Sequence, residues 1–150
     1  PVLYVLLLNA VNVGVSGGLM AANGKADLFF GLILPHGLLE LTAVFVAAGV
    51  GLRLGWTVVD PGPRRRSDAL AAEGRAAIAV ALGLVVVLLV SGVIEAFVTP
   101  SGLSTAARIT IGAVALATFL AYVEVLGRRG AAAGDTGDLA DAPDLQPTTA

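Results

Sequence analysis

One run of this chain has no polar side chain on any face of a helix: Val80-Ala81-Leu82-Gly83-Leu84-Val85-Val86-Val87-Leu88-Leu89-Val90. Ile111–Leu120 likewise lacks a polar face. The helices of a soluble bundle would each present a polar face to water. The two runs therefore favour helices that cross a membrane over a soluble bundle of buried helices.

Four segments have the roughly 20 mainly apolar residues that a membrane-spanning helix needs. They are Val2–Ala22, His36–Trp56, Ala76–Val98 and Ala106–Leu126. The composition agrees, since 57% of the residues are hydrophobic and 13% are charged. We therefore predict an all-α fold, a polytopic transmembrane helix bundle with about four spanning helices.

The segment between the first two spans is harder to assign. Gly24–Leu34 is apolar but too short to cross a membrane, and Pro35 follows it. We expect a short re-entrant or interfacial segment there.

Residues 1–128 are predicted to form the transmembrane domain, and residues 129–150 a disordered acidic tail. The tail is rich in Ala, Gly, Asp, Pro and Thr, and such a composition buries too little apolar surface to fold. The chain begins at Pro1, directly before an apolar run, without an initiator Met. We expect it to be the C-terminal part of a longer protein.

Basic residues are distributed unevenly among the connections. Arg64–Arg66 follow the second span and Arg128-Arg129 follow the fourth, while the other connections contain only Lys25 and Arg108. The positive-inside rule then places the arginine-rich loop and both ends of this segment in the cytoplasm, with the chain in the plasma membrane. The arginine run is expected to contact anionic membrane lipids and not nucleic acid, because it has no aromatic platform.

Punctuation residues predict where the helices begin and end. Asp60-Pro61-Gly62-Pro63 should end the second helix, because proline cannot continue it. Ser67 and Ser104 are predicted to cap the third and fourth helices. The third helix is expected to run unbroken from the cytoplasmic side through Val98.

Four ionisable residues lie in or beside the apolar segments: His36, Glu40, Glu95 and Arg108. His36 and Glu40 share a helical face at i, i+4. Because neighbouring spans run in opposite directions, we expect all four groups near the outer side, within about 6 Å of depth at 1.5 Å per residue. An ionisable residue inside a membrane is by default a candidate functional site.

Several interpretations of this polar cluster stay open. Glu95 and Arg108 could form a structural ion pair between two helices, or the carboxylates could handle protons or ions. His36, Glu40 and Glu95 could ligate zinc or manganese, but a second histidine is missing and Arg108 would oppose a cation. We assign no catalytic residue, no metal and no cofactor.

Two further polar sets are predicted to be structural. Asn9, Asn12 and Ser16 share a face of the first span, and such a face usually packs against another helix. Arg53 and Glu124 are predicted to pair between the second and fourth spans. The sequence contains no Walker motif, nucleophile elbow or dinucleotide fingerprint, and it has no cysteine.

Two strings carry a family resemblance: Leu34-Pro35-His36-Gly37-Leu38-Leu39-Glu40-Leu41 and Ile94-Glu95-Ala96-Phe97-Val98-Thr99-Pro100. Together with the first span they resemble the stage II sporulation protein M family, over about Leu3 to Leu126. The resemblance implies a multi-pass plasma-membrane protein with further N-terminal sequence. His36, Glu40 and Glu95 fall on family motif positions that have no established chemical role.

The same resemblance implies partners. In endospore formers, the family member works with peptidoglycan-degrading proteins, and relatives in other bacteria look like companions of a MoxR-type ATPase. We therefore expect a non-catalytic scaffold for envelope-remodelling partners, of unknown oligomeric state. The alternatives are a permease or transporter subunit that uses Glu40 and Glu95, and an intramembrane metal-dependent hydrolase. Glu40→Gln and Glu95→Gln are predicted to impair function more than Glu73→Gln, since Glu73 is expected in a solvated cytoplasmic turn.

Overall fold

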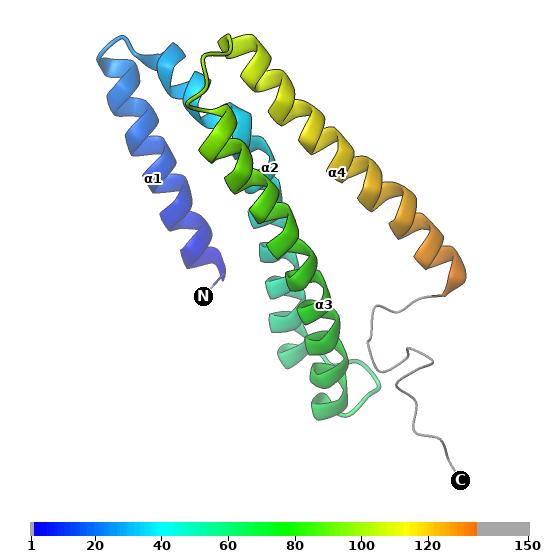
Figure 1. The fold of residues 1–150 in the computed structure, drawn as a ribbon. Helices are drawn as coiled ribbons and strands as arrows, with labels where there is room; N and C mark the ends of the chain where they lie inside the picture. The colour runs from blue at the N-terminus through cyan, green and yellow to red at the C-terminus, as the bar shows by residue number, and fades with distance from the viewer. Residues whose placement is uncertain (1, 135–150) are drawn as a thin grey trace.

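The computed structural model describes residues 2–134, which form four long helices and no strand (Figure 1). In chain order the elements are α1 (Val2–Ala22), α2 (Ala26–Val59), α3 (Arg66–Val93), the π-helical segment η1 (Ile94–Val98) and α4 (Thr105–Ala133). Four helices, counting α3 and η1 as one, are long and apolar enough to cross a membrane. The predicted all-α transmembrane fold with four spans is confirmed.

The helices alternate in direction, so the connections gather at two ends (Figure 1). The α1–α2 turn and the η1–α4 connection lie at one end, which we call the distal end. The α2–α3 loop, with Arg64–Arg66, lies at the other, which we call the arginine end.

The antiparallel pair of α2 and α3 is the centre of the fold. Leu39 and Ala43 of α2 and Leu84 and Ser91 of α3 are buried. The small side chains of Ala43 and Ser91 let the two helices approach closely.

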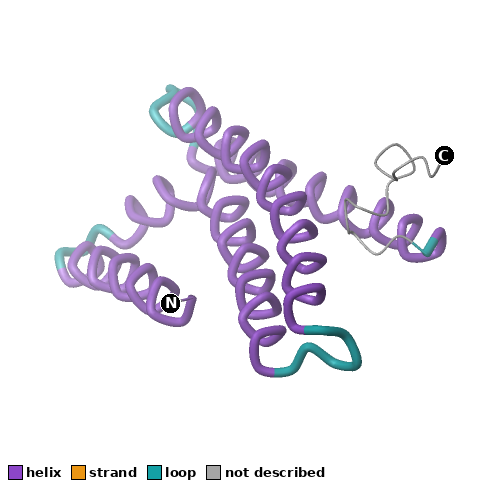
Figure 2. Tube along the Cα trace, turned by 90° about the horizontal axis from the view of Figure 1, so that it is seen from below, coloured by secondary structure: helices purple, strands orange, loops and turns teal. Residues whose placement is uncertain are grey.

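The other two helices are more loosely attached. No residue of α1 is buried, and Gly112 is the buried residue of α4. α4 lies against α2 near the distal end and then leans away from α3 (Figure 1). The result is an open arrangement in which α1 and α4 flank the central pair from different sides (Figure 2).

The segment before Pro35 is not a separate re-entrant piece. Residues 26–34 are helical and continue directly into the second span, so that α2 has 34 residues with Pro35 inside it. Proline lacks the N–H of the helical ladder and crowds the preceding turn, which kinks a helix. α2 accordingly changes direction near the distal end (Figure 2).

The predicted helix ends are largely correct. α2 ends at Val59, with Asp60 as its C-cap, and the Ser104 side chain caps α4 by accepting a hydrogen bond from the Ala107 N–H. Ser67 does not cap α3: the N-cap is Arg65, and the Ser67 hydroxyl donates to Asp68.

α3 and η1 together run unbroken through Val98, as expected, but with a π-helical end. α4 extends to Ala133, beyond its predicted end, so residues 129–133 are helical. The remainder of the predicted acidic tail, residues 135–150, lies outside the described residues.

Candidate functional site

A hydrogen bond fixes the register of α2 against α3 at the distal end. The Ser91 hydroxyl donates to the backbone carbonyl of His36 over 3.1 Å, and Ser91 is 2% exposed. Ser91 is a polar side chain next to the all-apolar run of α3, and this contrast is the signal that could have identified it from sequence. Residues 36 and 91 therefore lie at the same height.

His36 is connected to α4 through Thr99. The Thr99 hydroxyl lies 3.4 Å from His36 Nδ1, and the Thr99 carbonyl accepts a 2.6 Å hydrogen bond from Arg108 Nη1. Arg108 Nη2 donates to the Thr105 hydroxyl over 3.2 Å, while the buried Nε has no partner. Thr99 thus joins His36 and Arg108, a role that the sequence analysis did not identify.

The π-helical segment η1 carries Glu95 into this region. The Thr99 N–H bonds the Ile94 carbonyl five residues back over 3.0 Å, which is the spacing of a π-helix. Single π-helical turns occur often at functional sites. The carbonyl of Thr99, left free at the end of η1, is the group that Arg108 bonds.

Glu40 and Glu95 have no ion-pair or hydrogen-bond partner among the described residues, and both are exposed. The ion pair considered for Glu95 and Arg108 is not formed, because the guanidinium bonds the backbone and Thr105 instead. His36, Glu40 and Glu95 do not converge into a group that could hold a metal ion; within residues 2–134 no three His, Asp or Glu side chains do. The structure therefore divides the predicted cluster in two. His36 and Arg108 are linked through Thr99, whereas Glu40 and Glu95 have no partner among the described residues.

The heights of the two carboxylates follow from the register. Glu95 lies four residues beyond Ser91 toward the distal end, and Glu40 lies four residues beyond His36 toward the arginine end, each a displacement of about 6 Å. Their backbones are therefore further apart in height than the sequence predicted. Helical side chains tilt toward the N-terminus of their own helix, which brings both carboxylates back toward the level of Ser91.

Two contacts between α1 and α2 show which way Glu40 faces. Gly17 packs against the ring of Phe29, and Gly51 packs against Val2. Glu40 lies midway between Phe29 and Gly51, eleven residues from each (29 to 40 and 40 to 51), which is about three helical turns. Glu40 therefore lies on the face of α2 that is turned toward α1.

The polar residues of α1 lie in the stretch that runs alongside this part of α2. Asn9 and Asn12 lie between the α1 contacts at Val2 and Gly17, as His36 and Glu40 lie between the matching α2 contacts at Gly51 and Phe29. Both asparagines are exposed, as is Ser16, and the Asn9 amide bonds only the Val5 carbonyl of its own helix. Because all three are exposed, the polar face predicted to pack against a helix is open among the described residues.

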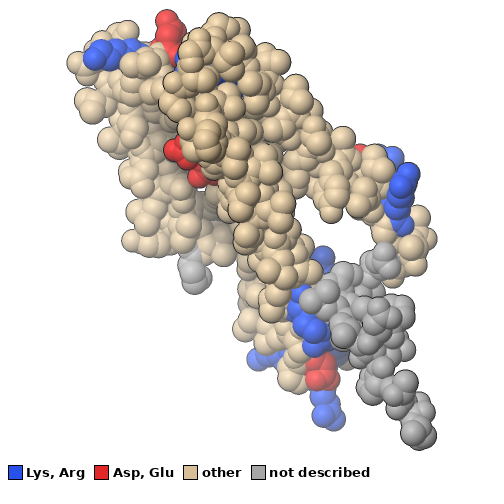
Figure 3. Space-filling model, viewed as in Figure 1, with Lys and Arg blue, Asp and Glu red and all other residues tan. Residues whose placement is uncertain are grey.

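We call Asn9, Asn12, Glu40 and Glu95 the distal polar face. Its members come from α1, α2 and η1, all are exposed, and within residues 2–134 no hydrogen bond joins one helix to another through them. In the space-filling view, acidic atoms surface between α1 and α3 in a region otherwise covered by uncharged residues (Figure 3).

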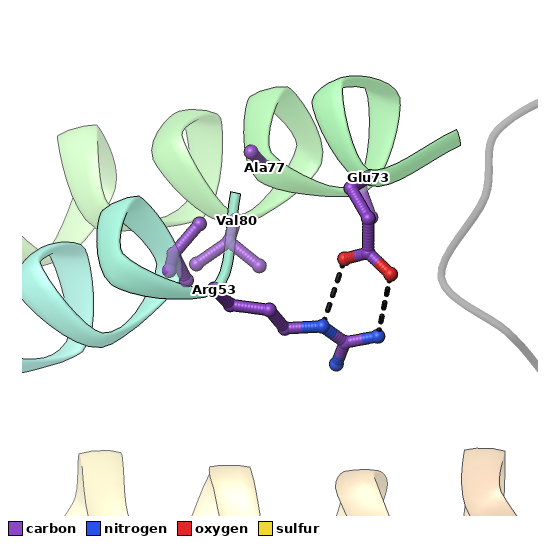
Figure 4. A pocket seen from close by; sticks show the side chains of 6 residues that line it. Arg53, Glu73, Ala77 and Val80 are labelled. Atoms are coloured by element: carbon purple, nitrogen blue, oxygen red, sulfur yellow. Dashed lines mark hydrogen bonds and ion pairs between the residues drawn. The ribbon is translucent and has the colours of Figure 1, made fainter. Parts of the chain in front are cut away.

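The arginine end differs. Arg53 of α2 and Glu73 of α3 form a two-point ion pair, Nε–Oε2 and Nη2–Oε1 both 2.8 Å (Figure 4). A small pocket of about 80 Å³ adjoins them. The expected solvated position of Glu73 is wrong, because its side chain is only 16% exposed. The predicted Arg53–Glu124 pair is also wrong, since Glu124 pairs with Arg128 one turn along α4.

Comparison with known proteins places this chain in a family. The family described as Stage II sporulation protein M matches residues 1–100, which hold α1 to η1 with His36, Glu40 and Glu95. The match ends before α4, whereas the sequence resemblance was expected to reach Leu126. No solved structure matches the chain.

A relative from Methanocaldococcus jannaschii, itself uncharacterized, is 28% identical over 97 residues, or 63% of this chain. The chain spans about half of that relative, 54% of its length. The family match covers 100 of the 150 residues. This chain is therefore a membrane protein that belongs to the stage II sporulation protein M family.

Proposed function

We propose that this chain is a non-catalytic scaffold that holds envelope-remodelling proteins together in the plasma membrane. The observation that carries the proposal is the open distal polar face, on which two carboxylates and two amides have no partner on another helix. Membership of the stage II sporulation protein M family supports it.

The energetic argument is the cost of polar groups in lipid. A carboxylate in the apolar part of a membrane costs up to about 2.5–3.5 kcal/mol on insertion scales. Glu40 and Glu95 recover none of this cost inside the chain, because neither has a partner among the described residues. A bound protein that supplies hydrogen-bond donors at this depth would remove the cost, and the same term would then stabilise the complex.

The orientation follows from the charges. Arg64–Arg66 are exposed at the arginine end. By the positive-inside rule, we propose that this end is cytoplasmic, together with both ends of the segment, and that the distal end is outside. The distal polar face would then be offered to partners near the outer surface, where peptidoglycan lies.

The bonded polar groups support a structural role over a catalytic one. The Ser91 hydroxyl donates to the His36 backbone and not to its ring. The Thr99–His36 contact of 3.4 Å is longer than the roughly 2.6–3.2 Å of a nucleophile and its base. Arg108 has two of its donors committed within the chain.

The permease alternative needs a path from the carboxylates to the cytoplasmic side. The pocket at the arginine end is lined by Arg53, Glu73 and apolar residues, and neither Glu40 nor Glu95 lines it. No observation therefore favours the permease over the scaffold.

Affinity purification in nanodiscs tests the scaffold. The tagged chain should recover the partner classes that the family resemblance implies, peptidoglycan-degrading proteins or a MoxR-type ATPase, above the level of an unrelated four-helix membrane protein. The Glu40→Gln, Glu95→Gln double variant should recover less, while Glu124→Gln should match the parent chain. Recovery no better than the unrelated protein would refute the proposal.

A further inference from the structure

We propose that the distal polar face binds a transmembrane helix of a second protein through a basic side chain, arginine or lysine, in the outer third of that helix. This inference rests on the proposed scaffold function and specifies the chemistry of the partner. The distal polar face supplies hydrogen-bond acceptors from three elements of the chain, and the chemistry that these acceptors share determines which partner can bind.

The two carboxylates provide the acceptors. Glu40 faces the line where α1 meets α2, while Glu95 projects from η1 on the adjoining helix. Ionised carboxylates only accept hydrogen bonds, and each offers two oxygens. A guanidinium carries five donors in a fixed fork and an ammonium carries three, so either cation can satisfy acceptors from neighbouring helices.

The asparagines extend the same surface. Asn12 has no hydrogen bond among the described residues, and the Asn9 amide bonds its own helix. A side-chain amide both donates and accepts, so these residues can bond polar groups that flank the basic side chain. The surface therefore combines negative charge with adaptable hydrogen bonding, and uncharged residues surround it (Figure 3).

A second copy of the chain fits this surface poorly. Its spanning cations are already bonded, Arg53 to Glu73 and Arg108 to Thr99. Lys25 lies about 22 Å along α2 from Glu40, at 1.5 Å per residue. Two copies that face each other at equal depth would therefore bring carboxylates against carboxylates.

Other occupants also fit poorly. His36, Glu40 and Glu95 do not gather into a group that could ligate a metal. An anionic lipid headgroup would be repelled by both glutamates. A basic side chain on a membrane helix has the required charge and can be held at the required depth.

Binding of designed single-pass peptides tests this inference. Three leucine–alanine helices would be used: one with arginine a third of the way from the outer interface, one with arginine a third from the inner interface, and one without arginine. The chain has no cysteine, so Gly127→Cys gives a single labelling site in an open position on α4. Energy transfer in phosphatidylcholine vesicles reports association.

The outer-arginine peptide should associate at about a tenfold lower peptide-to-lipid ratio than the other two, a difference of about 1.4 kcal/mol. The Glu40→Gln, Glu95→Gln variant should lose this preference, and Glu124→Gln should keep it. A Glu40→Lys, Glu95→Lys variant should instead prefer a peptide with outer glutamate. Circular dichroism of each variant separates lost binding from lost folding.

Equal association of all three peptides would overturn the inference, as would an unchanged preference in the double Gln variant. Self-association of the chain that depends on both glutamates would also overturn it, in favour of a second copy. Recovery of envelope partners without any preference for arginine would remove this inference and leave the scaffold standing. Preference for arginine without recovered partners would remove the proposed scaffold function and leave this inference standing.

Discussion

At the arginine end Glu73 is held by Arg53 through two 2.8 Å contacts, whereas at the distal end Glu40 and Glu95 have no cation although Arg108 belongs to the same region. The difference lies in what each arginine bonds. Arg53 bonds a carboxylate on the neighbouring helix, while Arg108 bonds the carbonyl left free at the end of η1 and the Thr105 hydroxyl.

This contrast distinguishes carboxylates that stabilise the fold from carboxylates that are available to bind a partner. A carboxylate that is only 16% exposed and paired stabilises the fold, and removing its partner leaves an uncompensated charge. An exposed, unpaired carboxylate among apolar surface contributes no such contact within the chain. We therefore expect substitutions at the arginine end to act on stability and substitutions of the distal glutamates to act on binding.

The largest effect should come from disrupting the packing of α4 against α2 near the distal end. A Cβ on Gly112 would collide with the backbone of Pro35, its carbonyl oxygen above all, and neither helix backbone can move locally without losing contacts. Gly112→Ala should destabilise the protein by about 3 kcal/mol or more, at or above the upper end of the range for overpacked cores, because the obstructing atoms are backbone. Thermal unfolding in nanodiscs measures the loss.

Two controls sharpen this result. Gly18→Ala and Gly127→Ala place a Cβ where no atom lies within 4 Å. Both should be neutral or slightly stabilising, because alanine is the better helix former. Spin labels at Leu28 and Val114, which are exposed, should show α4 displaced from α2 in Gly112→Ala only. An unchanged label distance and unfolding temperature in Gly112→Ala would contradict the direct backbone contact.

A smaller effect is expected from Arg108. Arg108→Gln removes two hydrogen bonds from a charged donor and leaves the Thr99 carbonyl uncapped, which should cost about 1.5–3 kcal/mol at most. Hydrogen exchange at residues 94–99 should speed up in this variant, while exchange in residues 66–80 should not change. If the variant changed the exchange rate of residues 94–99 no more than that of residues 66–80, Arg108 would not stabilise η1.

The arginine end gives the next effect. Glu73→Gln should lower the unfolding free energy by about 1 kcal/mol, the upper part of the range for exposed pairs, because Arg53 is 72% exposed. Added salt should reduce the difference between the variant and the parent chain. If the variant were as stable as the parent at low salt, the ion pair would contribute nothing to stability. The arginine end would then not differ from the distal end in having a stabilising carboxylate.

Much of the fold could be predicted because it depends on segment length, hydropathy and the residues that cap or end helices. The proline-rich loop at Asp60 ends α2, and Ser104 caps α4, since both effects are local. The sequence does not show that the segment before Pro35 continues into α2, because a proline usually marks a helix boundary. In α2 it lies within one helix that packs on α4 at Gly112, a contact between residues 77 positions apart (35 to 112) that periodicity does not reveal.

The candidate site was only partly predictable for a related reason. Sequence spacing places His36 and Arg108 near one end, but the identity of their common partner, Thr99, depends on the π-helical turn of η1. Charge alone suggested pairs between Glu95 and Arg108 and between Arg53 and Glu124. Neither forms among the described residues: Arg108 bonds the Thr99 carbonyl and Arg53 pairs with Glu73, and which acceptor an arginine bonds depends on side-chain geometry that charge alone does not give.

The smallest effect on stability, and the most informative one, should come from Glu40→Gln and Glu95→Gln. Neither carboxylate has a partner to lose within the described residues, and a neutral amide is less costly in lipid than a carboxylate. Each variant should therefore be at least as stable as the parent chain in nanodiscs, while complementation of a deletion strain should fall. Glu73→Gln should show the opposite pattern, with lower stability and retained complementation. If the distal variants lost stability to the same degree as Glu73→Gln, the distal glutamates would be structural as well, and the proposed binding role of the distal polar face would have no support from this contrast.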